Sequence, residues 1–369
     1  MKNKKAIAAV ASGTGLSVLA GLFLWWDTNV FAATELCAGK LTGEQAESLL
    51  DSRGRISDVT EGISDDVSFR CTVSRTSRIT GAEELEMVMN TAVYIPDFPF
   101  STYTWDNSSS RSFLSGDVTG AVSGSRGWVM LPEKCRYKVR GVLDGGVKLA
   151  PVPDNAQVVQ VELKKGTVDP QKLARVLVDA AQKVAAAAGC SNDAPLQAPK
   201  VRPPTSPEAI TADSLCGIPG FRLPGTAVAK GDAKLEVQRT SGAPSDSWAC
   251  DLYRSGGQDE PQLSFGSSFD PNIVDERLKS SVGFEDLADG TGVVDANSRA
   301  ILKCGGKDLY LGVHWDYSYL RPLYRNRSNP SDSATRDVFQ AFFDAAGKQH
   351  GCPSVKLPPD SSGPSGPSG

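Results

Sequence analysis

The sequence predicts an α+β protein built from two tandem duplicated domains, each an antiparallel sheet with a packed C-terminal helix and two disulfides, preceded by an N-terminal transmembrane helix. Three observations support this prediction. The 369 residues leave room for two domains of the usual size, about 150 residues each. The eight cysteines form two sets of four, and the first two cysteines of each set are 34 residues apart. Both sets close on a helical pattern that ends in Gly-Cys.

The first element is an apolar run at the amino terminus. Residues 6–26 carry no charge, and this length lets a helix cross a hydrocarbon layer of about 30 Å. Three lysines lie in the tail 1–5, which predicts a cytoplasmic tail and an extracytoplasmic remainder, with the membrane as a partner of the helix. The alternative is a signal peptide cleaved after Ala32. Both interpretations place the rest of the chain outside the cytoplasm.

The cysteines are the strongest pattern in the exported part. There is no C-x-x-C motif, and an exported location favours disulfides over a zinc site or a redox motif. We therefore expect no metal and no cofactor. Four cysteines in a half allow three pairings, and the constant first spacing favours a local clip. The pairing that we expect joins Cys37 with Cys71, Cys135 with Cys190, Cys216 with Cys250, and Cys304 with Cys352.

The cysteine sets also define the expected domains. The first domain spans 34–190 and the second spans 214–352. Residues 191–213 contain five prolines and little hydrophobic pattern, which is typical of a semi-extended linker. The tail 353–369 is rich in proline, serine and glycine, so we expect it to be disordered.

In the first domain, Thr42 and Gln45 have the spacing of a capping box, which predicts a short helix over 43–50. Asp169 and Pro170 are a cap and first-turn pair, and the apolar residues after them predict a helix that ends at Gly189. Alternation and β-branched residues predict strands over 67–74, 84–94, 127–131, 137–143 and 157–164.

The second domain repeats this plan. Pro219 and Pro224 lie where the first domain has its opening helix, so we expect that helix to be missing or remodelled. The closing helix carries its apolar residues at Val338, Phe339, Phe342, Phe343 and Ala346. Strands are expected near 234–238, 248–253, 262–265, 299–303 and 308–319.

The order of these features resembles a known group of domains. A cysteine near a short capped helix, a second cysteine 34 residues on in a strand, and a closing helix are similar to the small exported two-disulfide domains of actinobacterial cell-envelope proteins. They are more loosely similar to the extracellular sensor domains of mycobacterial serine/threonine kinases. The resemblance implies a PsbP/Mog1-like fold and a binding or sensing role in the envelope. It supplies no catalytic residues.

Charge and motifs exclude several functions. The 39 basic and 43 acidic residues give a net charge of -4 without a basic cluster, so nucleic acid is not an expected partner. No serine has the G-x-S-x-G or S-x-x-K context of a hydrolase nucleophile, and phosphate loops are missing. We therefore expect no catalytic residues and no enzyme. The alternative is a secreted hydrolase that uses paired carboxylates.

The expected function is that of a membrane-anchored binding or scaffolding protein of a bacterial cell envelope, with an envelope protein or a cell-wall polymer as partner. Two segments are candidate binding loops. An aromatic, proline-containing loop is typical of a ligand platform, and an arginine-containing loop suits carboxylates or an anionic polymer. The residues of the two loops are Phe98, Phe100, Tyr103 and Trp105 in the first, and Arg321, Tyr324, Arg325 and Arg327 in the second.

Overall fold

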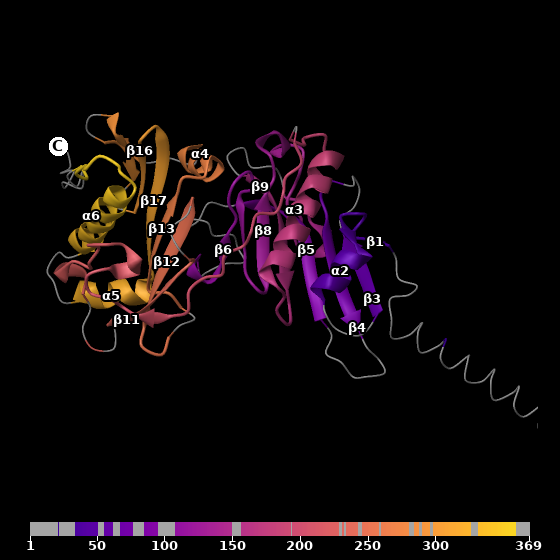
Figure 1. Cartoon of the computed structure of the whole chain (residues 1–369), viewed down its shortest axis with the longest axis horizontal. Coiled ribbons are helices and arrows are strands. Elements are labelled where there is room, and N and C mark those ends of the chain that lie inside the picture. Colours follow the sequence, from indigo (N-terminus) through magenta and orange to yellow (C-terminus); the bar gives the residue numbers. More distant parts are fainter. Residues whose placement is uncertain are drawn as a thin grey trace, which may run out of the picture. The chain divides into compact units, whose positions relative to one another are not determined.

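The computed structural model of the chain describes residue 21 and residues 34–50, 55–61, 67–76, 85–94, 108–149, 156–192, 194–228, 231, 234–242, 246–257, 260–279, 284–287, 290–295, 298–325 and 331–358. The chain divides into two compact units, Met1–Val93 with Val122–Ala198, and Tyr94–Ala121 with Pro199–Gly369 (Figure 1). This division differs from the predicted domains chiefly in the segment Tyr94–Ala121, which lies in the first half of the sequence but groups with the second unit.

The first sheet has seven strands in the order β3-β4-β5-β9-β8-β7-β6. The described strand pairs β3/β4, β4/β5 and β8/β9 are antiparallel, as predicted. The strands are β3 (Arg55–Glu61), β4 (Arg70–Thr76), β5 (Leu85–Tyr94), β6 (Ser112–Phe113), β7 (Gly120–Val122), β8 (Arg126–Met130) and β9 (Ala156–Leu163), and a separate hairpin joins β1 (Glu35–Leu36) to β2 (Leu41–Thr42).

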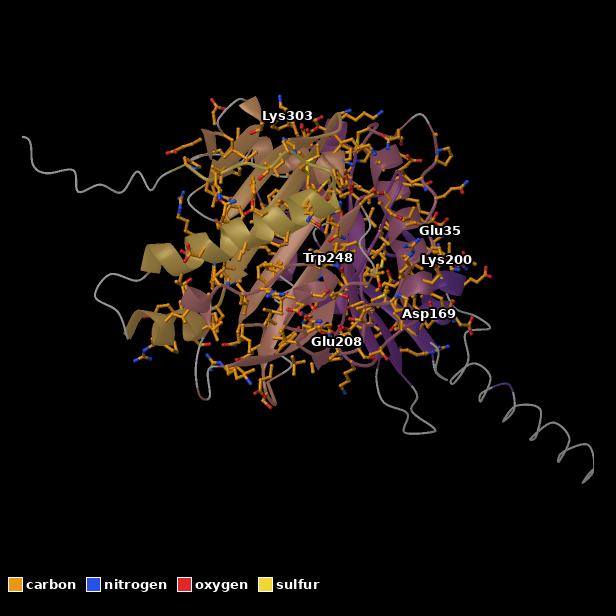
Figure 2. All side chains as sticks on the ribbon, turned by 60° about the vertical axis from the view of Figure 1, so that its left-hand side comes forward. Glu35, Asp169, Lys200, Glu208, Trp248 and Lys303 are labelled. Atoms are coloured by element: carbon orange, nitrogen blue, oxygen red, sulfur yellow. A yellow bond between two sulfur atoms is a disulfide. The ribbon has the colours of Figure 1, made fainter. Side chains whose placement is uncertain are left out.

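Both predicted helices of the first half are present. In α2 (Gly43–Leu49) the Thr42 hydroxyl accepts from the Gln45 amide while the Gln45 side chain accepts from the Thr42 amide, so the capping box is confirmed. In α3 (Pro170–Ala187) the Asp169 carboxylate, labelled in Figure 2, accepts from two amides of the first turn. The apolar face of α3 is buried and packs on β8 and β9.

The second sheet has eight strands in the order β10-β11-β12-β13-β17-β16-β15-β14, and all its neighbours are antiparallel. Helix α6 (Ser331–Gln349) covers one face, and its five predicted apolar residues are buried in the core of this unit (Figure 1). The strands are β10 (Glu208–Ala209), β11 (Leu235–Thr240), β12 (Ser247–Arg254), β13 (Leu263–Ser268), β14 (Phe284–Asp286), β15 (Gly292–Asp295), β16 (Arg299–Cys304) and β17 (Lys307–Trp315).

The two sheets share one strand order. If β10 is set aside, β11, β12, β13, β17, β16, β15 and β14 follow one another as β3, β4, β5, β9, β8, β7 and β6 do in the first sheet. The closing helix comes after the last strand of the sheet in the sequence in both cases: α3 follows β9, and α6 follows β17 with α5 between them. The opening helix of the second unit is replaced by a single turn, Leu215–Gly217. The α+β architecture is therefore as predicted, apart from the N-terminal helix.

All four disulfides form as predicted, between Cys37 and Cys71, Cys135 and Cys190, Cys216 and Cys250, and Cys304 and Cys352, and no cysteine is free. The second and fourth bonds fasten the chain just after α3 and α6. Cys190 is bonded to Cys135 in the turn that follows β8, and Cys352 is bonded to Cys304 at the end of β16. The predicted transmembrane segment 6–26 lies outside the described residues except for Gly21, and within the described part of the chain no helix is long and apolar enough to span a membrane.

Several local predictions are wrong. Residues 137–143 were expected to form a strand, but they contain only one isolated bridge, between Val142 and Lys148. The linker is not separate from the fold, because β10 joins the second sheet. Residues 353–358 were assigned to a disordered tail, yet Val355 and Leu357 are buried in the core of the second unit. Leu357 also receives a hydrogen bond from Arg336, 2.8 Å in length.

Candidate functional site

The structure changes the prediction for the arginine loop. Residues 321–325 are not a loop but belong to helix α5 (Tyr317–Arg325), and Arg321 is exposed there. The side chains of Tyr324 and Arg325, and all of Arg327, lie outside the described part of the structure. The same holds for the aromatic loop, because Phe98, Phe100, Tyr103 and Trp105 are not described. Of the predicted binding residues, Arg321 is therefore the one that can be placed.

Helix α5 is held by its buried residues and presents polar groups to solvent. Tyr319 is fully buried, and its hydroxyl donates to the carbonyl of Ala227. By contrast, Tyr317 is 71% exposed, and Tyr317 and Arg321 are four residues apart, so they lie on the same side of the helix. An exposed ring beside a guanidinium can stack on a sugar or contact a carboxylate. We call Tyr317 and Arg321 the α5 surface.

The start of α5 is fixed by a local cap and by hydrogen bonds to Gln262, just before β13, and to Arg254 of β12. The Asp316 carboxylate accepts from the Ser318 amide at 2.8 Å, and the Ser318 hydroxyl donates to Gln262 Oε1 at 2.7 Å. Arg254 at the end of β12 donates from Nη2 to the Ser318 carbonyl at 2.8 Å. These contacts hold the α5 surface in place, which lowers the entropic cost of binding a partner.

A second candidate place is a groove at the edge of the second sheet. It has a volume of about 550 Å³ and is lined by residues 207–210, 212 and 234–237 of β10 and β11 and their flanks. Its charged groups are already engaged, because Lys234 Nζ lies 3.1 Å from Glu236 Oε1 and Glu208 accepts from Gln238 at 2.9 Å. The α5 surface is the stronger candidate, because no carboxylate ion pair to Arg321 is found among the described residues.

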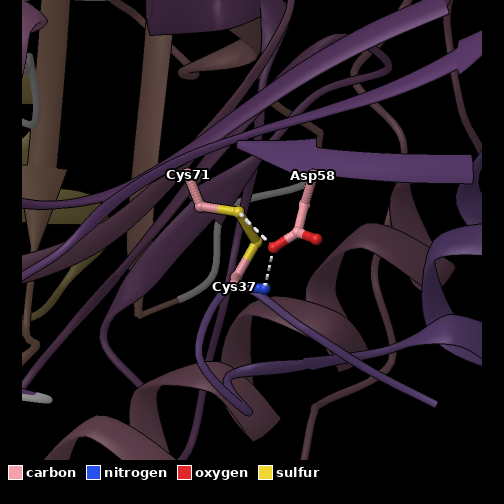
Figure 3. Close-up of side chains that lie close together, drawn as sticks. All are labelled: Cys37, Asp58 and Cys71. Carbon is pink, nitrogen blue, oxygen red and sulfur yellow. Dashed lines mark hydrogen bonds between the residues drawn. A yellow bond between two sulfur atoms is a disulfide. The ribbon is translucent and has the colours of Figure 1, made fainter. Parts of the chain in front are cut away.

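The third candidate is the corner at the first disulfide, where Asp58 on β3 faces Cys37 and Cys71 (Figure 3). The Asp58 Oδ2 atom accepts from the Cys37 amide at 2.8 Å and lies 3.9 Å from the Cys71 Sγ atom. Two thiolates and a carboxylate at this spacing would suit a soft divalent cation. Here the two sulfur atoms are bonded to each other, so they are not available as thiolate ligands. The corner is therefore a structural element.

The second unit builds the same corner with a different side chain. The Cys216 amide donates to Gln238 Oε1 at 2.8 Å, and Gln238 lies on β11 two residues before the residue that pairs with Cys250, as Asp58 does on β3 relative to Cys71. Cys37 and Cys216 both have left-handed backbone, with φ of 54° and 59°. This conformation is costly for a non-glycine residue, and the disulfide together with the amide hydrogen bond maintains it.

We expect Asp58→Ala to lower the free energy of unfolding of the first unit by about 1–3 kcal/mol, because the buried Cys37 amide loses its acceptor. Asp58→Gln should lower the free energy of unfolding much less, because the Gln238 side chain accepts the equivalent amide hydrogen bond, from Cys216, in the second unit. Chemical denaturation of the three proteins, with hydrogen exchange of the Cys37 amide, measures both effects. Equal losses in the two variants would show that the carboxylate charge matters and not the acceptor.

The buried carboxylate of Asp270 bears on the hydrolase alternative. Burial raises the pKa of Asp270, and the nearby Asp246 carboxylate adds a smaller effect in the same direction, while the hydrogen bond from Thr119 opposes both. A raised pKa is typical of a general acid. However, Asp270 Oδ1 accepts from the Asn272 amide and Oδ2 accepts from the Thr119 hydroxyl. Both oxygens are thus occupied at the start of α4 (Pro271–Lys279), which indicates a helix cap.

The sequence prediction missed Tyr317, because alternation placed it inside a strand that in fact ends at Trp315. Asp316 could have revealed the helix, since an aspartate followed by residues of helical spacing is a start signal. No family model, no curated protein and no solved structure matches this chain significantly.

Proposed function

We propose that the protein is an extracytoplasmic binding or scaffolding protein of a bacterial cell envelope, and that it uses the α5 surface to contact an anionic or sugar-containing partner. The predicted anchor 6–26, or its cleavage as a signal, accounts for export in this proposal. Support for an oxidising compartment comes from the four disulfides, which use all eight cysteines. The expected likeness to actinobacterial envelope domains agrees with this location.

The binding role rests on one observation: Tyr317 and Arg321 are exposed on a helix that is fixed to a disulfide-closed core. Aromatic rings and arginines contribute most to binding energies in protein interfaces. An envelope protein or a cell-wall polymer with carboxylate groups supplies the complementary chemistry. A catalytic role is not part of the proposal, because the buried carboxylate Asp270 is engaged as a helix cap.

We expect the double variant Tyr317→Ala/Arg321→Ala to bind at least about tenfold more weakly than the wild type to its envelope partner. The measurement is retention of the exported region, with its disulfides formed, on purified cell wall and on membrane extract. Tyr137→Ala is the matched control, because Tyr137 is also a largely exposed tyrosine, 65% accessible, but belongs to the first unit and not to α5. Equal retention of all three proteins would exclude the α5 surface, and no retention of folded wild type would contradict the binding role.

We also infer that the two units are copies of one ancestral domain. The shared strand order supports this inference, and so do the corners at Cys37 and Cys216, which repeat an unusual backbone conformation and its hydrogen bond. An experimental structure in which 34–190 fails to superpose on 213–352 with the cysteines in register would contradict it.

A further inference from the structure

The second sheet has a face that α6 does not cover. In β12, the side chains of Trp248, Cys250 and Leu252 belong to the core beneath α6. Side chains alternate along a strand, so Asp251 and Tyr253 lie on the opposite face. Both residues are fully buried. A carboxylate in the middle of a strand is costly to bury unless a hydrogen-bonded partner covers it.

The partner comes from the first half of the sequence. The Ser109 amide donates to Asp251 Oδ2 at 2.7 Å, and the Ser109 hydroxyl lies 3.4 Å from the Tyr253 hydroxyl. Ser109 belongs to a single turn, Ser108–Ser110, within the segment Tyr94–Ala121 that groups with the second unit. Ser109 is itself fully buried. The contact is therefore a specific, desolvated hydrogen bond and not a surface encounter.

The same segment is fastened at a second point. The Thr119 hydroxyl donates to Asp270 Oδ2 at 2.7 Å, and it accepts from Asn272 Nδ2 at 2.8 Å. Thr119 is 3% exposed and Asp270 is 8% exposed. Each attachment point thus joins the segment to a buried carboxylate of the second unit, one on β12 and one at the start of α4.

We propose that this face of the second unit is a docking site for a polar peptide strap, residues 108–119, which the first half of the chain supplies. The comparison between units supports this assignment. The connection after β13 carries α4, and Val274 of α4 packs on Ile301 and Tyr310 of its own sheet. The connection after β5 holds the strap, which contains β6, an edge strand of the first sheet, and which groups with the second unit. The second unit is consequently complete only when residues 108–119 are present.

The disulfides make this inference testable in the full chain. Every disulfide joins cysteines of the same half, so a cut between Lys200 and Val201 leaves no covalent bond between the two fragments. Lys200 is exposed, so an inserted recognition sequence for a specific protease is accessible there. After cleavage under native, non-reducing conditions, the C-terminal fragment is captured through a tag on the tail. We expect the N-terminal fragment to be captured with it.

The variant Thr119→Val is expected to speed dissociation of the cleaved fragments by about tenfold or more, because it removes a hydroxyl that donates to a buried carboxylate. Thr226→Val is the matched control. The Thr226 hydroxyl donates to Asp337 Oδ2 at the same distance of 2.7 Å, but both residues lie on the C-terminal fragment. This control should leave the dissociation rate unchanged.

Three outcomes would overturn the proposal. Fragments that separate at once, each with its native hydrogen-exchange protection, would show that the second unit does not need the strap. Equal dissociation rates for Thr119→Val and the wild type would show that another contact holds the fragments together. Equal acceleration by Thr119→Val and Thr226→Val would show that general loss of stability, and not docking of the strap, controls dissociation.

Discussion

Replacement of Phe265 by alanine is expected to lower the free energy of unfolding of the second unit by about 3–5 kcal/mol. Phe265 on β13 is fully buried between the sheet and α6. Its ring centroid lies 5.0 Å from that of Phe221 and 4.9 Å from that of Phe342. Loss of the ring removes apolar burial and leaves a cavity that these two aromatic neighbours can fill only in part.

The measurement is denaturant unfolding with the disulfides intact, combined with hydrogen exchange of the α6 amides so that the loss can be assigned to the second unit. Phe284→Ala is the matched control. Phe284 lies in the same sheet but is only partly buried, with the Arg299 guanidinium 5.3 Å from its ring centroid. It should cost no more than about 1 kcal/mol. Similar losses in both variants would contradict a core centred on Phe265.

The sequence predicted the features that depend on local chemistry or on fixed spacing. Capping residues act within one turn, so Thr42 and Asp169 located the starts of α2 and α3 correctly. The cysteine pairs could be predicted because two equal spacings of 34 residues are consistent with a local clip in each half. The closing helix α6 was evident from its phenylalanines at helical spacing, which are buried in the structure.

The alternation of apolar and polar residues gave a wrong prediction for the end of β17. Apolar residues alternate from Leu311 to Tyr319, but the strand ends at Trp315 and α5 begins at Tyr317. The Asp316 carbonyl and carboxylate accept from the amides that follow and turn the chain into the helix. Tyr319 then reaches the core from a helix and not from a strand. The apolar residues are thus buried by a helix and not by a strand. Over such a short run the period of apolar residues does not distinguish the two.

The strap could not be predicted from the sequence, because its partners are remote. Ser109 and Asp251 are 142 residues apart, and Thr119 and Asp270 are 151 apart. A serine-rich polar segment resembles an ordinary loop when its own neighbourhood is considered. The buried aspartate in β12 was the available signal, since an aspartate among Trp248, Cys250 and Leu252 in a central strand needs a partner. Which residue is that partner depends on the tertiary fold and cannot be predicted from the neighbouring sequence.

Removal of the disulfide between Cys135 and Cys190, by alanine at both positions, is expected to lower the free energy of unfolding of the first unit by about 4 kcal/mol, from chain entropy for a bond that closes a separation of 55 residues. Both side chains are buried, so alanine avoids the additional cost of a buried hydroxyl. The bond holds the end of α3 beside the turn that follows β8, on which α3 packs. The α3 amides should therefore lose hydrogen-exchange protection before the β3/β4 pair does.

The corresponding change in the second unit is Cys304→Ala with Cys352→Ala. It shows whether loss of a disulfide destabilises the whole chain or only the unit that contains the bond. This bond closes a similar separation, 48 residues, so the chain-entropy model gives it nearly the same stabilisation. Its removal should destabilise α6 and leave the exchange of α3 unchanged. A loss well below about 2 kcal/mol in both units would mean that the unfolded halves are already compact without the bonds, because the stabilisation comes from restricting the unfolded chain.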